Sequence, residues 1–226
     1  ALANKQLEVW DAATGKIQKG LTLPAKPNAV AWSPSGKRLA IGFETGEAYV
    51  VDATTWEGVF KGDHGGKSIL QLAFAASDDR LVVTLANTLV LWDVVAIKVM
   101  GDRTRKGMRS NMDALAVSPD GKVAVTGGYG GAIDRWDLSA ASESEPAKSV
   151  AQIGEADGAS NPVMALAALP DGGFVSGGSR GDLLVVGPDL AQRAHLVGHG
   201  GEVTDLSVSP DGKFVASAST DMSVLI

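Results

Sequence analysis

Short apolar runs, each bounded by turn residues, recur along the whole chain. In one stretch they cover residues 29–32, 39–43 and 48–51, and in the next stretch residues 70–74, 81–85 and 89–92. Runs of about four to eight residues between Gly, Pro, Asp and Ser clusters are typical of strands. No segment keeps apolar residues at the i, i+3, i+4, i+7 spacing of an amphipathic helix. The pattern therefore predicts an all-β chain of antiparallel hairpins in series.

Two independent markers repeat with nearly the same period. The third apolar run of each unit ends on an aromatic or apolar residue, a position called here the aromatic slot. It is occupied by Trp10, Val51, Trp92, Trp136 and Val186, with spacings of 41, 41, 44 and 50 residues. A turn slot follows the first run, with spacings of 42, 43, 51 and 40 residues, at Pro34, Ala76, Pro119, Pro170 and Pro210. Repetition at this length indicates stacked supersecondary units. In the Ser-Pro-Asp-Gly turns, Pro fixes one φ while Asp and Gly supply side-chain bonding and a left-handed residue.

Composition narrows the function classes. The 226 residues include 28 glycines and no cysteine, and the net charge is −6. The glycines suit many tight turns, and the missing cysteines exclude disulfides, thiolate metal sites, a cysteine nucleophile and covalent haem attachment within this chain. An acidic chain is a poor partner for nucleic acid. No apolar run approaches the length of about 18 residues that a membrane-spanning helix needs.

The chain resembles the tryptophan-aspartate (WD) repeat family of β-propellers. The resemblance rests on the period, on the Trp-Asp pairs Trp10-Asp11, Trp92-Asp93 and Trp136-Asp137, on the Ser-Pro-Asp-Gly-Lys turns at 118–122 and 209–213, and on Gly198-His199. It implies an all-β propeller of four-stranded antiparallel blades over residues 1–226. It also implies a structural hydrogen-bond chain, which the last unit supplies through His199, Ser217 and Asp221.

The alignment predicts about five to six visible blades. Complete blades are expected over about residues 27–196, and the chain starts and stops inside a blade. We expect these blades to belong to a six- or seven-bladed ring, because open edges of a propeller need partners. A five-bladed closure is the alternative if 226 residues are the whole native chain.

One basic cluster stands out in this acidic chain. Arg103, Arg105 and Arg109 fall in an expected loop between an outer strand and the next inner strand. By the resemblance, this loop shares the top face with the turns between second and third strands, where Tyr129 and Arg180 lie. Arg and Tyr are residues of interface type, so these five are candidates for binding a partner with an acidic surface. A solvated loop is the alternative interpretation.

Catalytic, cofactor and metal sites are not expected. The three histidines are His64, His195 and His199, and no carboxylate motif accompanies His195, which is placed on an outer strand. The glycine clusters at 127–131 and 177–181 precede no helix, so they predict turns and not phosphate cradles. The acidic stretch 139–147 predicts a tolerated loop insertion, with a recognition segment as the alternative.

The sequence favours a non-catalytic scaffold that binds another protein, or another domain of a larger chain, without inserting into a membrane. Two alternatives stay open: an accessory propeller of a bacterial redox enzyme or cytochrome complex, and a sensor domain of a larger signalling or nucleotide-driven switch protein. Catalysis in the central channel ranks below both. High Ala and Gly without Cys suggest a bacterial origin. The absence of Cys does not choose a compartment, so the localisation stays open, with the cytoplasm slightly favoured and the periplasm as the alternative.

Overall fold

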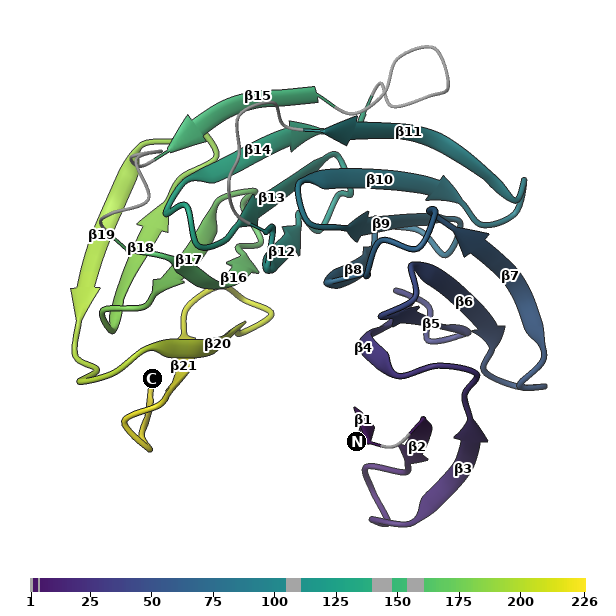
Figure 1. Cartoon of the computed structure of the whole chain (residues 1–226). Helices are drawn as coiled ribbons and strands as arrows, with labels where there is room; N and C mark the ends of the chain where they lie inside the picture. The colour runs from purple at the N-terminus through teal and green to yellow at the C-terminus, as the bar shows by residue number, and fades with distance from the viewer. Residues whose placement is uncertain (1, 4, 105–110, 140–147, 154–160) are drawn as a thin grey trace.

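The computed structural model describes residues 2–3, 5–104, 111–139, 148–153 and 161–226. These residues form strands and turns without any helix. Six antiparallel sheets follow one another around an open arc in chain order, with inner strands toward the centre and outer strands on the rim (Figure 1). The two chain ends lie on either side of the open sector. The all-β prediction is confirmed.

Four of the sheets have four strands in simple up-and-down order. The second sheet contains β4 (Pro27–Trp32), β5 (Arg38–Phe43), β6 (Glu47–Asp52) and β7 (Gly58–Asp63). The third contains β8 (Gln71–Phe74), β9 (Arg80–Thr84), β10 (Thr88–Asp93) and β11 (Lys98–Thr104). The fourth contains β12 (Ala114–Val117), β13 (Val123–Gly127), β14 (Ile133–Asp137) and β15 (Lys148–Ile153). The fifth contains β16 (Val163–Ala168), β17 (Phe174–Gly178), β18 (Asp182–Val186) and β19 (Gln192–Val197).

The first and last sheets have three strands each. The first contains β1 (Leu2–Ala3), β2 (Gln6–Trp10) and β3 (Ile17–Thr22). The last contains β20 (Val203–Val208), β21 (Val215–Ser219) and β22 (Val224–Leu225). The prediction of four-stranded antiparallel blades is thus confirmed for four sheets. The size of a complete ring stays a prediction.

The core lies in layers between consecutive sheets and not within any one of them. Between the second and third sheets, for example, Val50 and Phe60 pack with Leu81 and Trp92. Central strands are therefore apolar on both faces. In β10, for example, the first five of the six residues are buried. This two-sided burial explains why the central strands read as continuous apolar runs while the outer strands do not.

The Ser-Pro-Asp-Gly turns form as their residues predict. The Gly121 N–H donates to the Ser118 carbonyl at 2.8 Å, and Gly121 has a φ of +67°. Ser118 Oγ donates to the Asp120 carboxylate at 2.7 Å, and this bond is the first cause of a lowered pKa for Asp120. These turns join first to second strands, so they mark the face of the arc opposite to the top face.

Candidate functional site

Two turns of the top face meet the same short connection. Residues 161–163 run into β16, and the Val163 N–H donates to the carbonyl of Gly128, in the β13–β14 turn, at 3.0 Å. Asn161 Oδ1 accepts from Ser179 Oγ at 3.3 Å and from the Arg180 N–H at 3.1 Å, in the β17–β18 turn. The connection therefore fixes the turns of two neighbouring sheets relative to each other.

Two of the proposed contact residues project from these turns. Tyr129 is 60% exposed on the β13–β14 turn, and the Arg180 side chain is also exposed while its backbone is held by Asn161. The structure thus places the turns of Tyr129 and Arg180 side by side on the top face. Rigid backbone with exposed Tyr and Arg side chains suits a contact surface, because little order has to be gained on binding.

The basic cluster lies only partly within the described residues. Arg105 and Arg109 are outside them. Arg103 lies on β11, where it pairs with Leu89 of β10, and not in a loop as the sequence suggested. The difference arises because β10 is long enough to extend the ladder to Thr104. The contribution of the three arginines to a contact surface therefore stays a proposal.

A polar cluster that the sequence did not reveal lies beside Arg180. His195 Nε2 is 2.8 Å from Asp182 Oδ2, and Asn161 Nδ2 donates to Asp182 Oδ1 at 2.6 Å. No sequence motif pairs His195 with a carboxylate, yet the fold places Asp182 beside it. Asp182 starts β18 and His195 lies on the adjacent β19, so strand pairing and not sequence spacing brings them together. Burial raises the pKa of Asp182, but the bonds from His195 and Asn161 outweigh it and lower that pKa.

The last sheet contains a buried histidine network. His199 Nε2 is 2.8 Å from Ser217 Oγ, and its Nδ1 is 3.0 Å from both Asp221 Oδ2 and Ser223 Oγ. The Ser223 hydroxyl and the Gly200 N–H hold the pKa of Asp221 well below its usual value. Ionised Asp221 can only accept, so the Nδ1–H of His199 donates to it. This network ties the connection before β20 to the turn after β21.

The Trp and the Asp of the Trp-Asp pairs have separate structural roles. Trp92 and Trp136 are each 1% exposed, and Trp136 Nε1 donates to Thr126 Oγ1 at 2.9 Å, whereas Trp10 is 52% exposed. The carboxylates bond the turn that follows them. Each accepts from backbone N–H groups two or three residues ahead, as seen for Asp11, Asp93 and Asp137. Thr126, the acceptor for Trp136, aligns with Ser217 of the last sheet, but it was not among the residues predicted from the sequence.

Among the described residues, no group of three His, Asp or Glu side chains could hold a metal ion. No helix in that part of the chain is long and apolar enough to cross a membrane. The His195–Asp182 pair links two adjacent strands, and the His199–Asp221 pair links a connection to a turn, so each pair has a structural explanation.

Known proteins show the same repeat. Residues 191–226 match the family model described as "WD domain, G-beta repeat". This match covers β19 and the whole last sheet, so one repeat joins an outer strand to the inner strands of the next sheet.

Curated relatives match larger parts of the chain. Telomerase protein component 1 is 28% identical over 123 residues in Mus musculus and 30% identical over 126 residues in Rattus norvegicus, covering 54% and 55% of this chain and 5% of each relative. Cell division cycle 20.1, cofactor of APC complex, of Arabidopsis thaliana is 23% identical over 267 residues, covering 94% of this chain and 57% of that protein. The chain thus spans less than two thirds of these relatives. They come from animals and a plant, so they do not support the expected bacterial origin.

Proposed function

We propose that this chain, whose residues 191–226 match the WD-repeat model, is a WD-repeat propeller that serves as a non-catalytic platform for binding other proteins. The observation that carries the proposal is the linked pair of top-face turns. Their backbones are joined through residues 161–163, while Tyr129 and Arg180 remain exposed. The relatives do not favour the redox and switch alternatives. The Arabidopsis relative is named a cofactor of a complex, which agrees with a role in assembly.

The partner that we propose presents an acidic surface to the top face. Arg180 would pair with carboxylates, and Arg103, Arg105 and Arg109 would extend the positive field toward the neighbouring sheet. Exposed ion pairs steer association and are screened within about 10 Å at 0.1 M salt. Binding should therefore weaken steeply as ionic strength rises.

Affinity capture from the native source tests this function. The wild-type chain is compared with the double variant Tyr129→Ser/Arg180→Ser and with the triple variant Arg103→Ala/Arg105→Ala/Arg109→Ala. Lys122→Ser/Lys213→Ser is the matched control, because both lysines follow Ser-Pro-Asp-Gly turns on the opposite face. We expect a partner that binds the wild type and the control, and that loses about tenfold or more in affinity for the double variant. A partner whose affinity changes in neither top-face variant would refute this assignment.

A further inference from the structure

The turn between β10 and β11 carries an exposed apolar surface. Val95 and Ile97 are each 62% exposed, and Val99, the second residue of β11, is 38% exposed. These three residues, called here the β10–β11 tip, are all β-branched, and none of them belongs to the apolar clusters formed by the described residues. The tip lies in the third sheet, which has four strands and four-stranded sheets on both sides.

Ile97 also has a backbone conformation that its side chain disfavours. Its φ is +54°, in the left-handed region, where a β-branched residue is an outlier because its Cβ crowds the backbone. The corresponding turn of the first sheet has Gly15 at this position, with a φ of +66°. Glycine adopts this conformation without strain. The isoleucine therefore carries a cost that the turn itself does not require.

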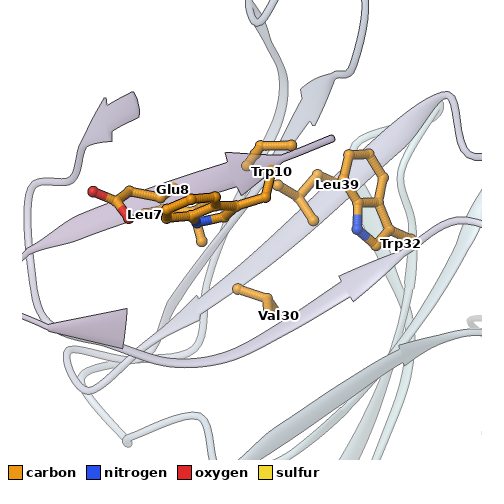
Figure 2. A pocket seen from close by; sticks show the side chains of 7 residues that line it. Leu7, Glu8, Trp10, Val30, Trp32 and Leu39 are labelled. Atoms are coloured by element: carbon orange, nitrogen blue, oxygen red, sulfur yellow. The ribbon is translucent and has the colours of Figure 1, made fainter. Parts of the chain in front are cut away.

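Two other turns between third and fourth strands also hold a large apolar residue with positive φ, but these residues are packed. Trp56, with a φ of +63°, packs against the core next to the first sheet, and its ring lies edge to face with that of Trp32, centroids 6.4 Å apart. Trp32 in turn pairs with Leu39 (Figure 2). Leu190, with a φ of +68°, packs against the core between the fourth and fifth sheets. Packing can offset the strain in these two turns, whereas Ile97 gains none within the described chain.

The charges near the tip favour a protein and not a membrane as its partner. The neighbouring β8–β9 turn lies against the tip, since the Val94 N–H donates to the Asp79 carbonyl at 2.7 Å. The charged residues of these two turns, with their ion-pair and strand partners, are Asp78, Asp79, Asp93, Arg38, Arg80 and Lys98. Their charges cancel, so they do not provide the positive field that an anionic lipid surface attracts. An apolar centre within a mixed polar rim is the anatomy of a protein interface.

The size and shape of the tip exclude a second copy of this chain as the partner. A stable interface buries about 800 Å² on each side, which is far more than three side chains supply. The tip is also convex, because it is the end of a hairpin, and two convex tips cannot enclose each other. The complementary surface is therefore a concave apolar pocket.

We propose that the β10–β11 tip is a second contact surface, which inserts into an apolar pocket of a partner protein. Insertion would give Ile97 the packing that Trp56 and Leu190 obtain within the chain. The tip lies on the face opposite to Tyr129 and Arg180, so this contact does not depend on the top-face function proposed above. A chain with a contact surface on each face can hold two partners at once.

Ile97→Gly tests whether the strain is uncompensated in the free full chain. Because glycine accepts a positive φ, we expect the midpoint temperature of unfolding to rise by roughly 2–4 °C. Trp56→Gly and Leu190→Gly are matched controls at positions with positive φ, and both should lower the midpoint because they remove packed side chains. The proposal is overturned if Ile97→Gly lowers the midpoint as the controls do.

Photocrosslinking through the tip identifies the partner. Benzoylphenylalanine replaces Ile97 in the full chain in its native source, and it replaces Val59 in the control, because Val59 is 40% exposed on β7 and lies outside the tip. We expect one protein that crosslinks through position 97 and not through position 59. With this protein purified, Ile97→Gly should weaken binding about tenfold or more, although it stabilises the free chain. Tyr129→Ser/Arg180→Ser should leave this affinity unchanged.

The other outcomes overturn the proposal. They are a crosslink from position 97 to lipid, to a second copy of the chain or to nothing, and a purified partner whose affinity Ile97→Gly leaves unchanged. If the partner's affinity falls in the top-face variant alone, the top-face function stands and the proposal for the tip fails.

Discussion

Asp113 offers a sharp test of how polar groups are satisfied between neighbouring sheets. It directly precedes the inner strand β12 and aligns with Asn28, the second residue of β4 in the second sheet. There Asn28 Nδ2 donates to Ser68 Oγ at 2.9 Å and to the Ile69 carbonyl at 3.2 Å, both in the connection to the next sheet. A carboxylate cannot donate in this way, and Asp113 Oδ2 is buried without a hydrogen-bond partner.

Burial accordingly raises the pKa of Asp113, although a side-chain bond from Asn111 lowers it in part. An unsatisfied buried oxygen costs about 1–3 kcal/mol, and partial exposure of the side chain places the cost near the lower limit. We expect Asp113→Asn to raise the free energy of unfolding by about 1 kcal/mol at pH 7, or the midpoint temperature by roughly 2–4 °C for a chain of this size.

The pH dependence identifies the cause of this gain. A carboxyl group whose pKa is raised by folding keeps a proton in the native state that the unfolded state releases, so stability falls as pH rises above the unfolded pKa of about 3.9. Urea unfolding should therefore show a small difference between wild type and Asp113→Asn near pH 4, and a larger one at pH 7. Asp120→Asn is the control with the opposite sign, because bonds lower the pKa of Asp120. A destabilised Asp113→Asn protein, or a gain that is equal at both pH values, would refute the reasoning.

Three further predictions test the architecture by thermal or urea unfolding of variants. Gly121→Ala should lower the free energy of unfolding more than Gly36→Ala does. Both glycines have a positive φ, but an added Cβ at Gly121 would lie 2.5 Å from the Ala76 Cβ, whereas an added Cβ at Gly36 would meet open space. Equal losses of stability would contradict this packing. Trp136→Phe should cost about 1–2 kcal/mol by leaving the buried Thr126 hydroxyl unpaired, and Trp136→Phe/Thr126→Val should recover part of it; no recovery would argue against this bond. His199→Ala should lower the free energy of unfolding by about 2 kcal/mol, because it leaves the buried Ser217 hydroxyl unpaired. It should also speed amide exchange in the turn after β21, which His199 holds through Asp221. Unchanged exchange there would contradict the network.

The positions of the central strands could be predicted from the sequence, because a strand that is buried on both faces is a continuous run of apolar residues. The apolar run 89–92 lies within β10 (Thr88–Asp93), and the run 39–43 lies within β5 (Arg38–Phe43). The turn chemistry was equally readable, since Pro, Asp and Gly each have one local reason to be in these turns. Local interactions of this kind depend on residues two to five positions apart.

The candidate site was harder to predict, because its contacts join distant parts of the chain. Asn161 reaches Arg180 and Asp182, and Asp182 reaches His195, through strand pairings that set which residues become neighbours. Asn161 directly precedes Pro162 before a strand, and this was the one available signal. The end of β11 was misplaced for a similar reason, since the ladder with β10 and not the local sequence decides where that strand stops.

The layered core has a consequence for how this chain tolerates change. Each interface is shared by two consecutive sheets only, so the loss of one aromatic residue, as at Val51 or Val186, is felt by a single neighbour. Substitutions on non-adjacent sheets should thus act additively, and each unit can drift in sequence while the next one holds its shape. A lineage of such chains can lengthen, shorten or diversify one unit at a time without a new fold having to arise.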